Sequence, residues 1–443
     1  MNGHPANGLI IAAPASGSGK TVVTLGLLRH LARTGVAVAS AKAGPDYIDP
    51  AFHAAATGRP CFNLDPWAMR SGTRAAVVAR ASDGADLVVC EGVMGLLDGA
   101  TASEGSTADL ASEGGWPVML VIDARAQAAS AAAVLRGFAG HRADVTIAGV
   151  IYNRVGSGRH AEVLRSASEA ALPDIPVLGC LPRTDGLELP ERHLGLVQAV
   201  EHPALETFLD RAADLIGAHV DVSALRGLAR SWHGRGDPTS PPVPPLGQRI
   251  AVAEDAAFAF RYPLTLNGWR DAGAEIMPFS PMADEAPATD ADAIYLPGGY
   301  PELHAGRLAA NTRFLAGLRD APVRGAAVFG ECGGYMVLGK GLVDADGTRH
   351  VMAGLLDLET SFAERGLHLG YRRATVAADG PLGAAGTRYC GHEFHYARVI
   401  AEGPGQPLFT CANAAGESMG ATGLVSSRVM GSFIHLIDRD EPG

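Results

Sequence analysis

The sequence contains little that would suit a membrane, a disulfide framework or a nucleic acid. No apolar run in the 443 residues reaches bilayer-spanning length, and the first residues lack a basic segment followed by an apolar one. The cysteines, at positions 61, 90, 180, 332, 390 and 411, have neither metal-site nor disulfide spacing. Acidic residues outnumber basic ones by 47 to 36, so a basic footprint for nucleic acid or lipid is absent. These absences predict a cytoplasmic protein with small-molecule partners, and they leave a homodimer open.

The length predicts at least two domains, each with its own core. Apolar strand segments in the first half alternate with helical ones, at 9–11, 36–39, 86–90, 117–122 and 145–152. Such strands, separated by helices at 22–33 and 127–138, indicate a parallel sheet covered on both faces. Residues 233–248 are rich in Pro, Gly and Ser and predict a linker. The predicted organisation is an α/β domain over 1–232, this linker, and a second α/β domain over 249–443.

A phosphate-binding loop is predicted between the strand at 9–11 and the helix at 22–33, where the chain reads APASGSGKT. Small residues let backbone N–H groups turn toward phosphate oxygens, and the helix N-terminus adds a favourable dipole. Lys20 would reach the β- and γ-phosphates, and the Thr21 hydroxyl would bind Mg²⁺. Pro14 stands where the full pattern has glycine, and an ordinary glycine-rich turn is the alternative. The predicted nucleotide-binding residues are Ser16, Gly17, Ser18, Gly19, Lys20, Thr21 and Val22.

Two further loops follow predicted strands at the edge of the sheet where open α/β folds bind ligands. The first, Lys42–Pro50 (KAGPDYIDP), holds two carboxylates three residues apart; Asp49 before a proline would also suit a helix N-cap. The second, Glu91–Gly99 (EGVMGLLDG), opens with an acid directly after an apolar strand, a usual position for a Mg²⁺ contact.

A third candidate is the end of the strand at 145–152, where Asn153 and Arg154 follow Tyr152. An amide at this position would suit the edge of a nucleotide base, so we assign both residues to nucleotide binding. Asp123, also at a strand end, is as consistent with a helix cap as with a ligand.

The phosphate loop and these two acidic loops together resemble the cobyrinic/hydrogenobyrinic acid a,c-diamide synthases, and the resemblance extends over essentially the whole chain. It implies a dethiobiotin-synthetase-like P-loop domain, using ATP and Mg²⁺, and a flavodoxin-like glutamine amidotransferase domain. ATP would phosphorylate two carboxylates of a corrin precursor, and ammonia from L-glutamine would convert them to amides. It further implies that Thr21, Asp49 and Glu91 bind the metal. The loop residues expected to bind substrate are Lys42, Asp46, Tyr47 and Asp98.

The second domain contains residues suited to releasing ammonia. Cys332 lies in Gly-Glu-Cys-Gly-Gly after an apolar strand, which resembles a nucleophile elbow. The following helix N-terminus is expected to lower the thiol pKa. An oxyanion site is expected from the N–H groups of Gly298, Gly299 and Gly333. A buried structural cysteine is the alternative.

His435, on a late apolar strand, is the expected base. Many glutamine amidotransferases have a glutamate two residues after this histidine, but position 437 is Ile. The corrin amide synthases also lack that third member, so a Cys332–His435 dyad is predicted. The sequence leaves open whether Asp438 partly replaces it.

Two runs near 367–373 and 391–398 mix basic and aromatic residues that would suit a macrocycle with several carboxylates. Arg372 and Arg398 are the expected substrate contacts. His392 and His395 would suggest a metal site, but a strand places them on opposite faces, so a substrate-binding or structural role is preferred.

Two other classes of protein are alternatives to this prediction. A MinD/ParA-like switch ATPase would have an additional lysine early in the phosphate loop, and residues 14–18 contain none. Such a protein would also have no use for Cys332 and His435. A cobyric acid synthase-like amidotransferase remains the nearer alternative, although its first acidic loops look different. No motif distinguishes a cobalt-containing from a cobalt-free corrin.

Overall fold

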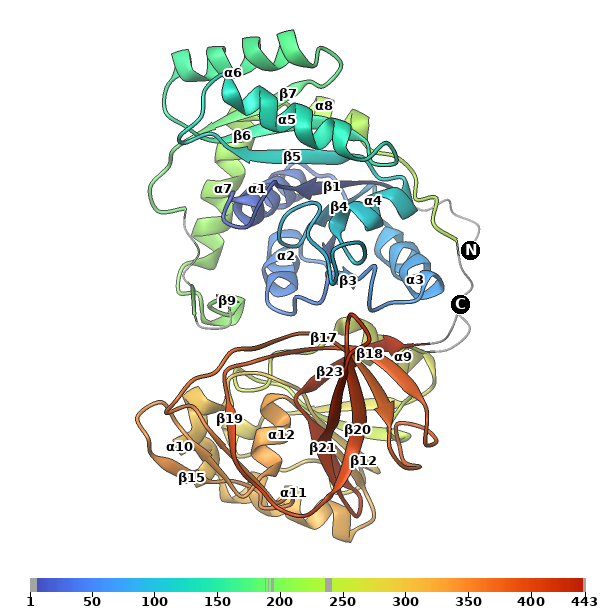
Figure 1. Cartoon of the computed structure of the whole chain (residues 1–443). Coiled ribbons are helices and arrows are strands. Elements are labelled where there is room, and N and C mark those ends of the chain that lie inside the picture. Colours follow the sequence, from blue (N-terminus) through green and yellow to red (C-terminus); the bar gives the residue numbers. More distant parts are fainter. Residues whose placement is uncertain (1–5, 188, 190, 193–194, 236–240, 441–443) are drawn as a thin grey trace. The chain divides into compact units, whose positions relative to one another are not determined.

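The computed structural model describes residues 6–187, 189, 191–192, 195–235 and 241–440 (Figure 1). The chain forms two compact units. The first comprises Met1–Trp67 and Ser71–Pro238, and the second comprises Ala68–Arg70 and Thr239–Gly443. Five residues of the predicted linker, 236–240, lie outside the described residues. Its last part belongs to a core: Val243 and Leu246 are buried, and the Trp269 indole N–H donates to the Val243 carbonyl over 3.1 Å.

The first unit is built on a parallel sheet with the strand order β3-β2-β4-β1-β5-β6-β7, which confirms the predicted class. Helices lie on both sides of this sheet in Figure 1. The strands are β1 (Asn7–Ala12), β2 (Val38–Ala43), β3 (Phe62–Leu64), β4 (Leu87–Glu91), β5 (Val118–Asp123), β6 (Ile147–Val155) and β7 (Val177–Pro182). The helices are α1 (Lys20–Arg33), α2 (Asp49–Thr57), α3 (Ser71–Ser82), α4 (Thr107–Gly114), α5 (Ser130–His141), α6 (Gly158–Ala171), α7 (Leu205–His219) and α8 (Val222–Leu228).

Strand β2 differs from its predicted range. It begins two residues later than expected and continues through Ser40 and Lys42, both of which are buried. Polar side chains at these positions suggested that the strand had already ended. Lys42 is tolerated inside the sheet because its charge is paired there.

The second unit contains a mixed sheet with the order β11-β10-β12-β13-β22-β21-β20-β17-β18-β23. Its parallel part consists of β10 (Arg249–Ala253), β11 (Glu275–Phe279), β12 (Ala293–Leu296), β13 (Ala327–Glu331) and β22 (Val429–Ser432). Its antiparallel part consists of β21 (Ser418–Ser426), β20 (Gln406–Asn413), β17 (His368–Val376), β18 (Arg388–His395) and β23 (Ile434–Arg439). The parallel part confirms the predicted α/β class.

Smaller elements complete this unit. A second sheet has the order β15-β14-β16-β19. Its strands are β15 (Arg349–Val351), β14 (Gly341–Val343), β16 (Leu358–Ser361) and β19 (Arg398–Glu402). The α-helices are α9 (Pro263–Asp271), α10 (Ala305–Ala310), α11 (Thr312–Val323) and α12 (Gly333–Leu338), and a short 3₁₀ helix, η3, covers Pro301–His304.

Two hydrophobic cores pack on this unit's main sheet, and β13 contributes to both. Val328 and Cys332 belong to one core, whereas Ala327 and Phe329 belong to the other. This alternation follows from the two-residue period of a strand. The nucleophile candidate therefore lies where a fully buried strand ends.

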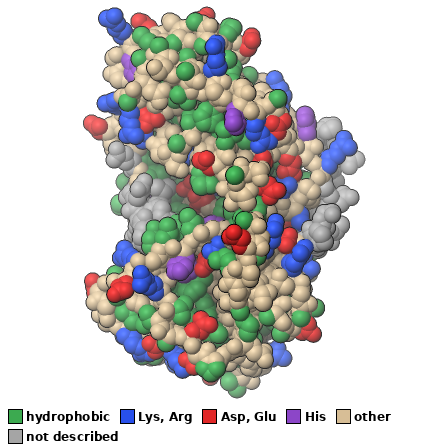
Figure 2. Space-filling view, in the orientation of Figure 1, with side chains coloured by type: hydrophobic (Ala, Val, Ile, Leu, Met, Phe, Trp, Pro, Cys, Tyr) green, Lys and Arg blue, Asp and Glu red, His purple; other side chains and the backbone are tan. Residues whose placement is uncertain are grey.

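The distribution of charge and the length of the helices can be described for this structure. On the face shown in Figure 2, acidic and basic side chains are interspersed among the described residues rather than gathered by sign. None of the helices in the described part of the chain is long and apolar enough to cross a bilayer.

Candidate active sites

The predicted phosphate loop connects β1 to α1, and its backbone requires glycine at two points. Gly17 and Gly19 have φ of 77° and 88°, which other residues rarely adopt. A Cβ on Gly19 would also lie 2.2 Å from the Asn153 amide nitrogen. Helix α1 begins at Lys20, so its first N–H groups are available at the loop.

The end of β6 holds this loop. The Asn153 amide donates to the Ser18 carbonyl (3.0 Å), and Arg154 Nη1 donates to the Gly17 carbonyl (2.7 Å). Asp123 accepts from Arg154 (2.5 Å) and from the Arg125 N–H (3.0 Å). The structure thus brings Asn153 and Arg154 to the phosphate loop. Their contact with a base stays a prediction.

A buried polar cluster lies beside the loop, centred on Glu91 at the end of β4. Glu91 Oε1 accepts from the Thr21 hydroxyl (2.7 Å) and from Lys42 Nζ (3.0 Å). Glu91 Oε2 lies 2.7 Å from His53 Nε2. Lys42 Nζ also donates to Asp49 Oδ2 over 2.6 Å. The three residues expected to bind the metal, Thr21, Asp49 and Glu91, are therefore neighbours.

His53 was missed by the sequence analysis. It is fully buried on α2, one helical turn after Asp49, and its second ring nitrogen faces the Cys61 sulfur at 3.5 Å. The i, i+4 spacing of Asp49 and His53 on one helix face was the available signal.

The charges in this cluster determine each other's protonation. Burial by itself lowers the pKa of Lys42, but the charges of Asp49 and Glu91 raise it well above its usual value. The pKa of Glu91 is lowered despite burial, because Lys42 and His53 stabilise the carboxylate. Burial and the nearby Asp46 charge raise the pKa of Asp49 to about 6. Burial and the Lys42 charge lower the pKa of Lys20. Two buried ammonium groups beside a loop of N–H donors suit a polyphosphate.

These residues also fit a Mg²⁺ ion. One hydroxyl and two carboxylates provide the hard oxygen donors that this ion prefers. Thr21 and Glu91 already share a hydrogen bond, so both oxygens face the same point.

The loop after β2 corrects one expectation. Asp49 is not a helix N-cap: α2 includes it, and its carboxylate is bonded to Lys42. The capping bonds come from Asp46 Oδ1, which accepts from the N–H groups of Ile48 (2.8 Å) and Asp49 (3.0 Å). Tyr47 is buried, and Asp98 accepts from the Gly95 N–H over 3.0 Å. Substrate binding by Lys42, Asp46, Tyr47 and Asp98 stays a prediction.

In the second unit, Cys332 lies at a sharp turn between β13 and α12. Its φ of 48° and ψ of −106° are strained for a residue with a side chain, which is the conformation expected of a nucleophile elbow. The glycines around it allow a close approach of backbone. A Cβ on Gly333 would lie 3.0 Å from the Gly299 nitrogen. The three expected oxyanion residues therefore converge on Cys332.

His435 is brought to the same point. A Cβ on Gly298 would lie 2.4 Å from His435 Cε1 and 3.2 Å from Cys332 Cβ, so both side chains border this glycine. Both residues are buried, each with 1% of its surface exposed. The structure thus places the predicted pair together, although they are about a hundred residues apart in the sequence.

The expected low thiol pKa is wrong. Burial raises the pKa of Cys332 well above its usual value, and the nearby Glu302 charge raises it further; the hydrogen bond from Gly333 N–H, at the start of α12, lowers it less. Burial, with His392 and His395, lowers the pKa of His435 to about 3. The pair therefore consists of a neutral thiol and a neutral imidazole. Such a pair needs proton transfer from sulfur to nitrogen during the attack on substrate.

Asp438 forms hydrogen bonds with Arg70. It is fully buried and accepts from Arg70 through its N–H (2.9 Å), Nε (3.1 Å) and Nη2 (2.8 Å). The segment Ala68–Arg70 is counted with the second unit, so this bond lies within one unit. The carboxylate that the sequence suggested as a partial replacement for the third member is thus engaged by an arginine.

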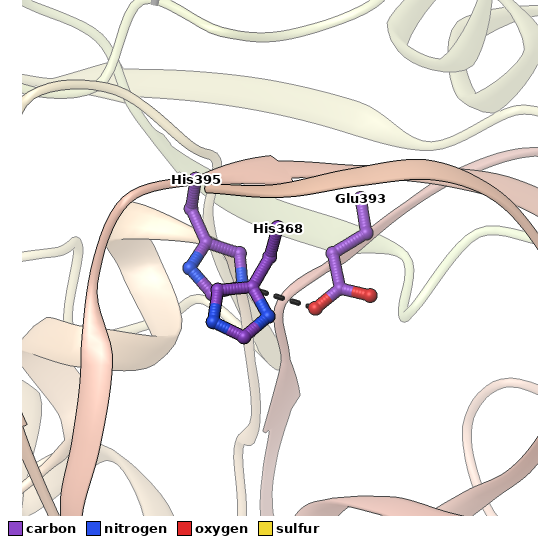
Figure 3. A group of neighbouring side chains, drawn as sticks. All are labelled: His368, Glu393 and His395. Carbon is purple, nitrogen blue, oxygen red and sulfur yellow. Dashed lines mark hydrogen bonds and ion pairs between the residues drawn. The ribbon is translucent and has the colours of Figure 1, made fainter. Parts of the chain in front are cut away.

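The strand expected at His392 and His395 is confirmed as β18, which ends at His395, so these two side chains do point to opposite faces. His395 instead groups with His368 and Glu393, whose potential ligand atoms lie within 4.8 Å of one another (Figure 3). The two imidazole rings are stacked, 4.7 Å apart and 8° from parallel. Because imidazole lone pairs lie in the ring plane, stacked rings do not direct them at one ion.

Both arginines expected to bind substrate have internal partners. Arg372 Nε donates to Glu393 Oε2 over 2.7 Å, and Arg372 is largely buried. Arg398 is half-exposed and pairs with Glu364 at 3.2 Å. Their contact with a corrin stays a prediction.

Taken together, one unit has a glycine-rich loop before a helix with an acidic cluster beside it, and the other has a strained turn at Cys332 that lies against His435 and three glycines. These features define a glutamine-dependent amide ligase. Two family models match the chain: the CobQ/CobB/MinD/ParA nucleotide binding domain at residues 9–197 and the CobB/CobQ-like glutamine amidotransferase domain at 249–442. The chain belongs to the family of the hydrogenobyrinate a,c-diamide synthases.

Relatives with that name match almost end to end. The protein from a Sinorhizobium species is 55% identical, with 98% of this chain and 99% of the relative covered. Those from Brucella anthropi and Rhodobacter capsulatus are 56% and 54% identical; each match covers 97% of this chain and 98% of the relative. The second matched domain argues against a MinD/ParA-like switch, because a switch ATPase does not need a glutaminase.

Proposed function

We propose that this chain converts the a and c acetate carboxylates of hydrogenobyrinate to amides in cobalamin biosynthesis, with ATP and glutamine as co-substrates. The full-length similarity to proteins of that name supports the substrate. The observation that carries the reaction type is the strained Cys332 elbow facing His435 across Gly298. We also propose that Thr21, Asp49 and Glu91 bind Mg²⁺.

In the first unit, the substrate carboxylate attacks the γ-phosphate, ADP leaves, and an acyl phosphate forms. Lys20 and the loop N–H groups stabilise the charge on the phosphate oxygens, and bound Mg²⁺ would supply further positive charge there. Lys42 keeps Asp49 and Glu91 in place through its two ion pairs. Ammonia then attacks the acyl phosphate, phosphate is released, and the amide forms.

In the second unit, Cys332 attacks the side-chain carbonyl of glutamine while its proton moves to His435. The oxyanion is held by N–H groups of Gly333 and the Gly298–Gly299 loop. His435 returns the proton to the departing nitrogen, so ammonia and a thioester form, and water hydrolyses the thioester to glutamate.

A pair of variants tests the two half-reactions. Cys332→Ser keeps the shape but removes an effective nucleophile, so amidation with glutamine should fall at least 10²-fold. Amidation with ammonium chloride at mildly alkaline pH should remain, because free ammonia enters after that step. Lys20→Ala should abolish amidation from both nitrogen sources and leave glutamine hydrolysis measurable.

Each reaction is followed by mass detection of the mono- and diamide, with hydrogenobyrinate and cobyrinate as separate substrates. Equal loss with glutamine and ammonium in Cys332→Ser, with an unchanged melting temperature, would refute the two-site assignment. Amidation of cobyrinate alone would refute the proposed substrate.

A further inference from the structure

Glu331, the last residue of β13, and Cys332, which follows it, hold the segment that carries His435. The Cys332 N–H donates to the Ser432 carbonyl over 2.8 Å, before His435 in the chain. The Leu436 N–H donates to Glu331 Oε1 over 3.0 Å, directly after His435. His435 therefore lies between two anchor points that belong to the nucleophile and to its immediate neighbour.

Glu331 is itself tightly held. It is 4% exposed, and its second oxygen accepts from the Tyr295 hydroxyl over 2.5 Å. The Tyr295 ring packs edge-on against Trp269 and stacks on Phe329, so its hydroxyl is fixed. Both carboxylate oxygens of Glu331 thus have defined donors, which fixes the oxygen that faces Leu436.

Neither of the two positions after Leu436 offers an unengaged carboxylate. Position 437 is Ile, and Asp438 is bonded to Arg70. A buried carboxylate costs free energy unless its hydrogen bonds are satisfied. The burial of Glu331 directly before the nucleophile therefore calls for an explanation.

We propose that Glu331 is a positioning residue for His435: it fixes the backbone directly after this histidine, so that the imidazole stays against Cys332. This inference rests on the proposed role of Cys332 and His435 in releasing ammonia. Glu331 itself does not contact the reacting atoms. A displacement of about 1 Å at a catalytic group reduces the rate on the order of 10²-fold, which sets the expected effect.

Two substitutions of similar length isolate the hydrogen bond. Glu331→Gln keeps an oxygen that accepts from Leu436, whereas Glu331→Met has none. We expect Glu331→Met to lower kcat for glutamine-dependent amidation on the order of 10²-fold, with the KM for glutamine within about threefold. Glu331→Gln and Tyr295→Phe should each stay within about fivefold of wild type, because both keep the bond to Leu436.

Two readouts separate positioning from a general structural role. Amidation with ammonium chloride should be unchanged in all three variants. The rate at which a diazo-ketone analogue of glutamine labels Cys332 should fall in parallel with kcat. If Glu331→Met does not fold, Glu331→Ala, which leaves room for water at the Leu436 N–H, replaces it.

Equal activity of Glu331→Met and wild type with glutamine would overturn the inference. Equal loss in the Met and Gln variants would also overturn it, because charge rather than the hydrogen bond would then be responsible. Retention of glutamine-dependent amidation by Cys332→Ser would instead refute the proposed dyad.

Discussion

Replacing Gly298 with alanine should separate the two half-reactions by adding one methyl group. Gly298 does not have a positive φ, so its backbone accepts alanine without strain. The new methyl carbon, however, would lie 2.4 Å from His435 Cε1, 3.1 Å from His435 Nε2 and 3.2 Å from Cys332 Cβ. It would be inserted between the base and the nucleophile.

The size of the effect follows from these distances. Ordinary van der Waals contact between carbons begins near 3.5 Å, so the imidazole must move by about 1 Å. His435 and Cys332 are buried in a close-packed core and have little room to share this displacement. A displacement of about 1 Å costs on the order of 10²-fold in rate. We therefore expect glutamine-dependent amidation to fall about 10²-fold in Gly298→Ala.

The assay compares glutamine with ammonium chloride as nitrogen source at saturating ATP and corrin. Amidation from ammonium should be unchanged, because the substitution lies in the glutaminase unit. Gly306→Ala in α10 is the matched control: its new methyl group would meet His350 Cε1 at an ordinary 3.5 Å, and activity should equal wild type. Full glutamine-dependent activity in Gly298→Ala would refute the placement of His435 against Cys332.

Two further predictions concern buried charges. Lys42→Met removes the cation that pairs with both buried carboxylates, Asp49 and Glu91, which should cost about 3–5 kcal/mol and lower the unfolding temperature of the first unit by roughly 10 °C. The control Lys340→Met breaks the half-exposed ion pair with Asp357 and should change the unfolding temperature little. Equal unfolding temperatures in the two variants would contradict the stabilising role of Lys42. Burial raises the pKa of Glu331 to about 7 from an ordinary 4.5. Between pH 4.5 and pH 7, Glu331 is therefore protonated in the folded chain and ionised in the unfolded chain. Stability from this group is greatest below pH 4.5 and falls by about 3 kcal/mol as the pH rises through 7. Denaturant titrations of wild type and Glu331→Gln should therefore converge toward low pH, and a constant difference from pH 4.5 to 8 would contradict this.

The antiparallel half of the second unit's sheet shows where sequence patterns lose information. Strands β17, β18, β20 and β21 have charged or polar residues at many positions, and three of these, Arg372, Glu393 and His395, are buried or half-buried in the structure. Their polarity suggested a substrate-binding run. Glu393 stabilises this burial because it pairs with Arg372 of the neighbouring strand β17 and with His395 of its own strand. The pair between strands depends on the register of two segments that are distant in the sequence.

The thiol pKa shows the same limitation at a single residue. A cysteine before a helix predicts a stabilised thiolate, because a helix N-terminus presents N–H groups. The helix is present, but burial of Cys332 outweighs it. The burial of Cys332 depends on Phe433, Tyr335 and other residues of the surrounding core. The sequence of the local motif contains no information about these residues.

Features that are encoded within a few consecutive residues can be predicted from the chain alone. The glycine-rich loop between β1 and α1, the Gly-Glu-Cys-Gly-Gly turn and the alternation of apolar strands with helices all follow from local backbone preferences and spacing. The partner of each buried carboxylate, in contrast, depends on tertiary contacts. Lys42 and His53 were found at Glu91, Arg70 at Asp438, and Leu436 at Glu331, because a buried charge is stabilised by the donors that folding brings within about 3 Å, and those donors come from distant parts of the chain.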